Sequence, residues 1–155
     1  MIIRPAETRD IPGMIELLKQ VGQVHHQIRP DLFRAGAQKY DEAALERLLQ
    51  DPGRPIFIGE AEGMVAGYCF CILQVTENDP VLCDRKVLYI DDLCVEESLR
   101  GRGIATELYR HALDYGRSIG CDAVTLNVWC GNGAQVFYEK CGMKPQKIGM
   151  EFVLC

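Results

Sequence analysis

A chain of 155 residues can bury a substantial core but is short for two domains, so we expect a single domain over residues 1–155. Its net charge of −5 argues against nucleic acid as a main partner and is compatible with a cationic one. No apolar run is long enough to span a bilayer, and the first residues lack the layout of an export signal. We therefore expect a cytoplasmic protein that binds neither nucleic acid nor membrane.

The cysteines indicate neither a disulfide framework nor a metal site. Five of the eight lie beside apolar residues in predicted strands or helices, where a reduced cysteine is a small hydrophobic residue. No CxxC pair occurs, and Cys69 and Cys71, which a strand would point the same way, lack a second pair of ligands. We expect no metal.

The first half of the chain alternates strand-like and helical patterns. A proline stops the first apolar run, and apolar residues then recur at helical spacing after Thr8 or Asp10, either of which can cap a helix. Two apolar runs about a Glu62-Gly63 turn should pair as a hairpin. The elements expected here are a strand over 2–6, a helix to about 21, a helix over 41–50, and strands over 55–61 and 65–73.

The second half predicts two strands joined by a helix. A central strand over 87–95 leads through a glycine-bearing loop into a helix that ends near Ile119. An apolar strand over 123–129 follows, so the two strands should run parallel. A last helix over 134–141 and a returning strand over 146–154 complete a mixed sheet flanked by helices.

The loop after the central strand has the features of an anion site. It opens a helix, where unpaired backbone N–H groups meet the positive end of the helix dipole. Two glycines, which lack a Cβ, let the backbone approach an anion closely. Two arginines can form bidentate hydrogen bonds with phosphate oxygens. A dinucleotide fingerprint would need a third glycine, and no P-loop run occurs, which argues against NAD and ATP. We predict that a diphosphate lies against Arg100, Gly101, Arg102, Gly103, Ile104, Ala105 and Thr106.

The pattern Arg100-x-x-Gly103-x-Ala105 after a strand ending in residues 93–95 resembles the acyl-CoA-binding signature of the GNAT N-acetyltransferase superfamily. Residues 134–143, AQVFYEKCGM, are similar to the second family signature, A-x-x-F/L-Y-E-K-x-G-F/M. The resemblance covers nearly the whole chain in order. It implies an α/β fold, α+β in some schemes, with about six to seven strands, about four helices and a splayed central parallel pair. It also implies acetyl-CoA as the co-substrate.

The resemblance assigns roles around the thioester. In the family, main-chain groups of the central strand hold the acyl carbonyl and the pantetheine arm, and these correspond to Leu93, Cys94 and Val95. An ordinary closed sheet is the alternative, because the main-chain groups of a strand normally form hydrogen bonds with the neighbouring strands. Tyr138 corresponds to the acid that contacts CoA and protonates the leaving thiolate, and its reference pKa of about 10 suits a thiol. Otherwise Tyr138 fills a core stripe of the last helix.

The acceptor amine needs a base or a solvent relay, since it is mostly protonated at neutral pH. Asp91 and Asp92 are adjacent carboxylates on an apolar strand and should face opposite sides. In polyamine-acetylating relatives an acidic residue at the place of Asp91 faces the acceptor; Asp92 or an ion-paired, non-catalytic carboxylate is the alternative. His25, His26 and Arg29 lie where such folds place the acceptor-side wall.

One departure from the family concerns an asparagine that contacts CoA three residues before the last helix. That position is Gly131 here, and Asn132 stands one step closer. Either the loop is one residue shorter and Asn132 still reaches CoA, or this contact is lost.

The sequence with its resemblance thus predicts direct acetyl transfer from acetyl-CoA to a primary amine of a small metabolite, within a ternary complex. An acyl-enzyme on Cys94 is disfavoured, because no histidine is paired with it in the sequence. A peptide or protein amine is the alternative acceptor, and a non-catalytic acyl-CoA-binding module is the alternative of another class. A monomer and a homodimer fit equally well.

Overall fold

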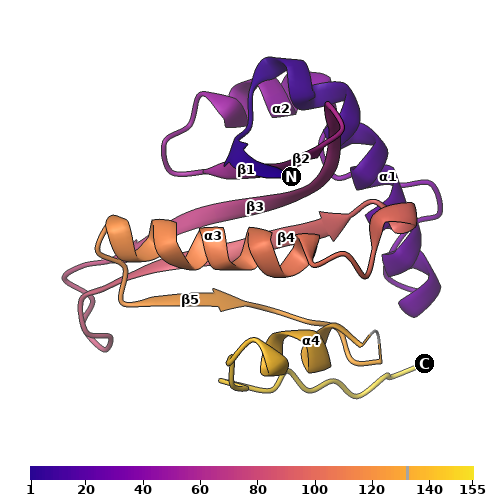
Figure 1. The fold of residues 1–155 in the computed structure, drawn as a ribbon. Coiled ribbons are helices and arrows are strands. Elements are labelled where there is room, and N and C mark those ends of the chain that lie inside the picture. The colour runs from indigo at the N-terminus through magenta and orange to yellow at the C-terminus, as the bar shows by residue number, and fades with distance from the viewer. Residues whose placement is uncertain (132) are drawn as a thin grey trace.

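The computed structural model describes residues 1–131 and 133–155, which form one mixed sheet with helices on both faces (Figure 1). The strands lie in chain order, and only β4 and β5 are parallel to each other. Their bounds are β1 Ile2–Pro5, β2 Ile56–Ala61, β3 Met64–Thr76, β4 Arg85–Val95 and β5 Ala123–Leu126. The helices are α1 Ile11–Ile28, α2 Glu42–Leu49, α3 Ile104–Ser118 and α4 Ala134–Lys140, with 3-10 turns η1 Thr8–Asp10 and η2 Glu97–Leu99.

Each face of the sheet has its own apolar cluster. The stripe of α1 that includes Met14 and Leu18 packs with α2 against Tyr68 of β3, and all three side chains are fully buried. On the opposite face, Leu108 of α3 packs against Leu88 of β4, and both are also fully buried. The sheet is therefore covered on both sides, as its apolar central strands require.

A β-bulge interrupts the pairing of β3 with β4. Cys71 faces Ile90 and Phe70 faces Asp92, so Asp91 is an extra residue on β4. The bulge changes which residues face which helix layer. Before it, Ile90 packs in the cluster around α3; after it, Val95 packs there, whereas Cys94 packs in the cluster around α1.

The predicted fold class is confirmed, but several boundaries differ. Within the described residues the sheet has five strands rather than about six to seven, because residues 146–154 run without a strand partner. A strand is stable only where a neighbour supplies hydrogen bonds. The first helix continues past Val21 to Ile28, just before Pro30, and β5 ends at Leu126 rather than near residue 129. No helix in the described part of the chain has both the length and the apolarity needed to cross a membrane.

Candidate active site

The sheet opens where β4 outlasts its parallel neighbour. β5 pairs with Val87–Ile90 and ends at Leu126, whereas β4 continues to Val95. Along residues 91–95, β4 pairs with β3 on one side, and on the other side no described strand accompanies it. The splayed parallel pair is therefore present, and a closed sheet is excluded at this point.

Main-chain groups of Leu93 and Val95 face this opening. The amide of Glu96 donates to the carbonyl of Ala66 on β3 at 2.8 Å. Because residues of an antiparallel strand alternate in direction, Cys94 then directs its main-chain groups to β3, and Leu93 and Val95 direct theirs away. Of the three residues predicted to hold the acyl arm, two thus have main-chain groups on the open side. The carbonyl of Val95 already accepts one hydrogen bond, from Gln20 Nε2 at 2.9 Å.

The loop after β4 presents consecutive free amides. No amide from Gly101 to Thr106 donates to any residue that the structure describes, whereas the amide of Arg100 donates to Glu97. Gly101 and Gly103 have φ of +79° and +81°, a conformation that other L residues rarely adopt. The carbonyl of Gly103 accepts from Glu107 at 3.0 Å, so α3 begins normally and its first amides remain unpaired.

Charge and geometry at this loop agree with the predicted anion site. Arg100 and Arg102 are exposed, and neither forms an ion pair with another described residue. The loop follows directly from the open end of β4 through η2, so the free amides and the opening lie at the same end of the strand (Figure 1). The positive end of the α3 dipole adds to the attraction for an anion.

The two aspartates face the same side of the sheet, contrary to the expectation for a regular strand. Asp91 Oδ2 accepts from Lys39 Nζ at 2.8 Å and from the Tyr40 hydroxyl at 3.0 Å. Asp92 Oδ2 accepts from the Tyr68 hydroxyl at 2.7 Å. Both tyrosines belong to the apolar cluster around α1 and α2. The expectation of opposite sides was wrong because the bulge at Asp91 breaks the two-residue alternation.

These two carboxylates have different electrostatic surroundings. Burial raises the pKa of Asp92, although the hydrogen bond from Tyr68 and the charges of Lys39 and His25 oppose that rise. Asp91 instead has a cation beside it, the half-exposed side chain of Lys39. Burial would lower the pKa of Lys39, but its hydrogen bond to Asp91 and the charges of both aspartates leave that pKa raised. Lys39 is therefore held as an ammonium against Asp91.

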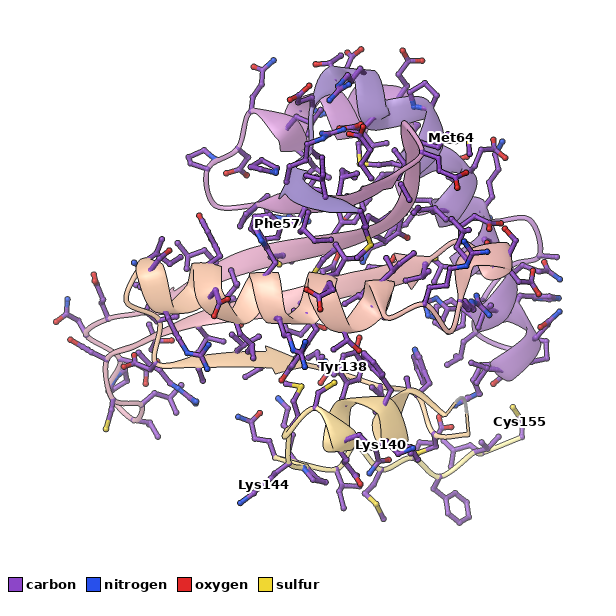
Figure 2. All side chains as sticks on the ribbon, viewed as in Figure 1. Phe57, Met64, Tyr138, Lys140, Lys144 and Cys155 are labelled. Atoms are coloured by element: carbon purple, nitrogen blue, oxygen red, sulfur yellow. The ribbon has the colours of Figure 1, made fainter. Side chains whose placement is uncertain are left out.

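Tyr138 projects from α4 toward the sheet (Figure 2). Its ring centroid lies 6.0 Å from that of Tyr109 on α3, and the side chain packs against the cluster around α3. Burial raises the pKa of Tyr138, with further rises from the charges of Cys69 and Asp92. Within the described residues its hydroxyl has no hydrogen-bond partner. The packing expected of a core residue is present, and the role as an acid stays a prediction.

The predicted acceptor-side residues gather at the end of α1. The rings of His25 and Phe33 are 4.9 Å apart, and Phe33 meets the edge of Trp129 at 5.5 Å. Arg29 lies 5.9 Å from the Trp129 ring and pairs with Asp31 and Glu151. Of the three, His25 is the one whose charge favours a lower pKa of Asp92.

His26 bonds to the loop that follows α1. Its Nδ1 lies 2.7 Å from the carbonyl of Phe33, which ties the helix end to that loop. Asn132, the predicted CoA contact before α4, lies outside the described residues. Among the described side chains no group of three His, Cys, Asp or Glu gathers as metal ligands, and all eight cysteines are free thiols.

Gln20 is a site residue that the sequence did not reveal. Its Nε2 donates to the carbonyl of Val95, and its Oε1 accepts from the amide of Glu97 at 3.2 Å. It therefore joins α1 to the open end of β4 and to the start of the anion loop. A polar residue on a helix normally meets solvent, so no sequence signal singled it out. Lys39 and Tyr40, which precede α2, and Tyr68 of β3 were missed because their contacts with the aspartates join segments that are distant in the chain.

A sequence profile described as the acetyltransferase (GNAT) family matches residues 22–143. Glucosamine 6-phosphate N-acetyltransferase of Arabidopsis thaliana is 35% identical over 84 residues, which cover 50% of this chain and 55% of that protein, so the chain spans about half its length. Glucosamine 6-phosphate N-acetyltransferase 1 of Oryza sativa subsp. japonica is 27% identical over 96% of this chain and 84% of that protein.

Solved structures of other proteins have the same fold as this chain. A mutant of the BH1408 protein from Bacillus halodurans superimposes with a TM-score of 0.95 at 31% identity, over 100% of both chains. The aminoglycoside N-acetyltransferase AAC(6')-Iy, crystallised with CoA, shares the fold with a TM-score of 0.72 at 18% identity, over 99% of this chain and 100% of that chain. The profile match over most of the chain, together with the splayed strand pair and the free amides, shows that this chain belongs to the acetyltransferase (GNAT) family of acyltransferases.

Proposed function

We propose that the protein is an acetyl-CoA-dependent N-acetyltransferase that moves the acetyl group directly to the primary amine of a small metabolite. One observation carries the proposal: six consecutive amides, Gly101 to Thr106, donate to no described residue and adjoin a strand whose main chain is open at Leu93 and Val95. Free amides next to an open strand can bind a ligand that has a diphosphate at one end and a carbonyl at the other. Bound acetyl-CoA would supply an acetyl group activated as a thioester.

The amides of residues 101–106 hold the diphosphate, and the side chains of Arg100 and Arg102 add charge outside it. Leu93 directs main-chain groups into the opening, where its N–H can polarise the carbonyl that the amine attacks. Gln20 fixes the end of β4 and the first turn of the loop relative to each other. These residues position the two reactants, which is a large part of the catalysis of such a transfer.

Asp91 and Asp92 have different roles toward the acceptor amine. Asp91 holds the acceptor ammonium, which is supported by the ammonium of Lys39 that it already holds at 2.8 Å. Asp92 takes the proton, directly or through water, and its raised pKa makes it a better base than an exposed carboxylate. Tyr138, which its raised pKa keeps protonated at neutral pH, donates its proton to the departing thiolate.

The acceptor is an amine of limited size. The two plant relatives make glucosamine 6-phosphate the first compound to test, since it is a small primary amine. The acidic pair favours acceptors with one or more ammonium groups, which also keeps polyamines in the panel. A peptide amine remains the second candidate acceptor, and the chain's net charge of −5 is compatible with a basic peptide.

The test has two stages. First, thermal melts of the protein with CoA, ATP and NAD should show stabilisation by CoA alone, because only a ligand of the folded state raises the melting temperature. Second, thiol release from acetyl-CoA should be followed with glucosamine 6-phosphate, polyamines, amino acids and basic peptides. Turnover with a small amine supports the proposal. Stabilisation by CoA without turnover would identify a non-catalytic binding module, and preference for a peptide would replace the proposed acceptor.

A further inference from the structure

The loop between α1 and α2, residues 29–41, carries two side chains that contact Asp91. Lys39 Nζ and the Tyr40 hydroxyl lie 2.8 and 3.0 Å from Asp91 Oδ2. The side chain of Gln38 donates to the carbonyl of Tyr40 at 2.7 Å, which gives this end of the loop a defined conformation. The contacts that fix the loop relative to the sheet therefore also place Lys39 and Tyr40 at the proposed acceptor site.

Gly22 lets this loop approach α1 very closely. A Cβ at position 22 would lie 2.2 Å from the carbonyl oxygen of Ala37, far inside van der Waals contact. Glycine weakens the interior of a helix relative to alanine, so a glycine at this place in α1 needs a reason outside the helix. The close approach of Ala37 is such a reason. With any larger residue at position 22, the loop backbone would have to move by about 1 Å.

A second contact holds the loop one helical turn further along α1. His26 lies four residues after Gly22, hence on the same face of the helix, and its Nδ1 lies 2.7 Å from the carbonyl of Phe33. A carbonyl oxygen can only accept, so Nδ1 carries the proton of this hydrogen bond. The loop thus runs back along the helix, with Phe33 beside His26 and Ala37 beside Gly22. Two residues after Ala37 comes the lysine that contacts Asp91.

We propose that Gly22 and His26 are positioning residues, which hold the 29–41 loop against α1 and so limit the size of the acceptor amine that reaches Asp91. This inference rests on the proposed function. Hydrogen bonds of 2.8 and 3.0 Å do not survive a shift of about 1 Å, so a loop displaced from Gly22 would release Asp91 from both of its partners. The space beside the carboxylate would then be larger, and the selection against bulky amines weaker.

Acceptor preference tests the inference. Ethylamine and 2-phenylethylamine carry the same primary ammonium and differ by one ring. In Gly22→Ala, kcat/KM for 2-phenylethylamine relative to ethylamine should rise about tenfold, while CoA affinity in calorimetric titration stays within about twofold. His26→Leu should change the ratio in the same direction. His26→Asn, which keeps an N–H donor near the place of Nδ1, should restore most of the wild-type ratio.

Gly13→Ala is the matched control on the same helix. A Cβ at position 13 would lie 2.7 Å from the side chain of Val65 on β3, so this variant also introduces a clash. Gly13 precedes Gly22 by nine residues, which is about 13 Å along the helix axis. The control should lose stability without a change in the ratio of the two amines. An unchanged ratio in Gly22→Ala, or an equal change in Gly13→Ala, would overturn the inference.

Chemical labelling of Lys39 tests the position of the loop without any turnover. Burial would lower the pKa of Lys39, but the hydrogen bond to Asp91 leaves it raised, which slows reaction with an amine-reactive reagent. In Gly22→Ala the labelling rate, followed by peptide mass spectrometry, should rise severalfold. Lys19, which pairs with Glu16 on α1, should keep its rate and serves as the internal reference.

The two measurements separate this inference from the proposed function. Equal labelling rates of Lys39 in the wild type and in Gly22→Ala would show that Gly22 does not position the loop, whatever the enzyme turns over. If the wild type turns over no amine of the panel, the proposed function is refuted, and the labelling rates still decide whether the loop depends on Gly22.

Discussion

The two sides of the opening in the sheet are made differently. The proposed cofactor side is made of main chain: amides of residues 101–106 that donate to no described residue, and the open edge of β4, with left-handed glycines that shape the loop. The proposed acceptor side is made of side chains, with Asp91 and Asp92 held by Lys39, Tyr40 and Tyr68. Main-chain amides recognise a diphosphate whatever the side chains are, whereas an acceptor is selected by the particular side chains that meet it.

Loss of the proposed acid should have the largest effect. Tyr138→Phe keeps the ring that packs near Tyr109 and removes only the hydroxyl. We expect kcat for thiol release to fall about 100-fold or more, with CoA affinity within about twofold, because general acid catalysis contributes on that scale. Steady-state kinetics and calorimetric titration with CoA measure the two quantities. Tyr109→Phe is the control and should keep its turnover. Equal turnover in Tyr138→Phe would remove this residue from the mechanism.

Removal of the charge of Asp92 and removal of the charge of Asp10 should change the stability of the fold in opposite directions. The pKa of Asp92 is raised mainly by burial, so its charge opposes folding at neutral pH. Burial also acts on Asp10, but its hydrogen bonds to Arg4 and to the amide of Glu7 outweigh it, and the pKa of Asp10 is lowered. Its charge therefore stabilises the fold above the unfolded-state pKa, and this contribution is lost as pH falls through the folded-state pKa.

We expect Asp92→Asn to lower turnover by about 100-fold yet raise the melting temperature at neutral pH, with the gain shrinking as pH falls through the pKa of Asp92. Asp10→Asn should lose about 2 kcal/mol of stability at neutral pH, because it removes the carboxylate that pairs with Arg4 beside Glu60. Thermal melts over a pH series measure both. If the two variants shift the melting temperature in the same direction at neutral pH, the assignment of their charges is wrong.

Distortion of the loop should weaken the cofactor side alone. Gly103→Val forces a β-branched residue into φ of +81°, which costs about 1–3 kcal/mol or moves the amides. CoA should bind about tenfold more weakly, while amine specificity is unchanged. Gly63→Val is the matched control, since Gly63 has φ of +73° at the tip of the β2–β3 hairpin, far along the chain from the loop. Calorimetric titration with CoA should show no change there. Unchanged affinity in Gly103→Val would refute the placement of the diphosphate.

The smallest effect should come from the acceptor side. In the proposed site Lys39 would compete with an acceptor ammonium for Asp91, and the side chain of Lys39 is 48% exposed. Lys39→Met should lower KM for the amine about threefold with kcat unchanged, because an exposed ion pair contributes little. Lys19→Met, which removes a similarly exposed charge paired with Glu16 on α1, should leave KM unchanged. A raised KM in Lys39→Met would mean that Lys39 helps to bind the acceptor instead.

The two sides of the opening also differ in how far they could be predicted from the sequence. The loop with unpaired amides could be located because its determinants are adjacent in the chain: two glycines, two arginines and a helix start. That it binds an anion stays a prediction. The family signature on α4 was equally local and pointed to Tyr138. The parallel pair followed from a strand, helix and strand in succession, and pairing of Val87–Ile90 with β5 confirms it. The single domain, the cytoplasmic location and the absence of a metal stay predictions.

The sequence by itself thus determined the fold class and the place of the glycine loop before α3, because periodicity and short-range backbone conformation produce them, and its two signature motifs pointed to the family. Tertiary structure alone decided the direction of Asp91 and Asp92, since a bulge is a property of two strands in register. It alone brought Gln20 to the carbonyl of Val95, 75 residues away. It alone left residues 146–154 without a strand partner among the described residues, because a strand pattern states what a segment can pair with but not whether a partner is within reach.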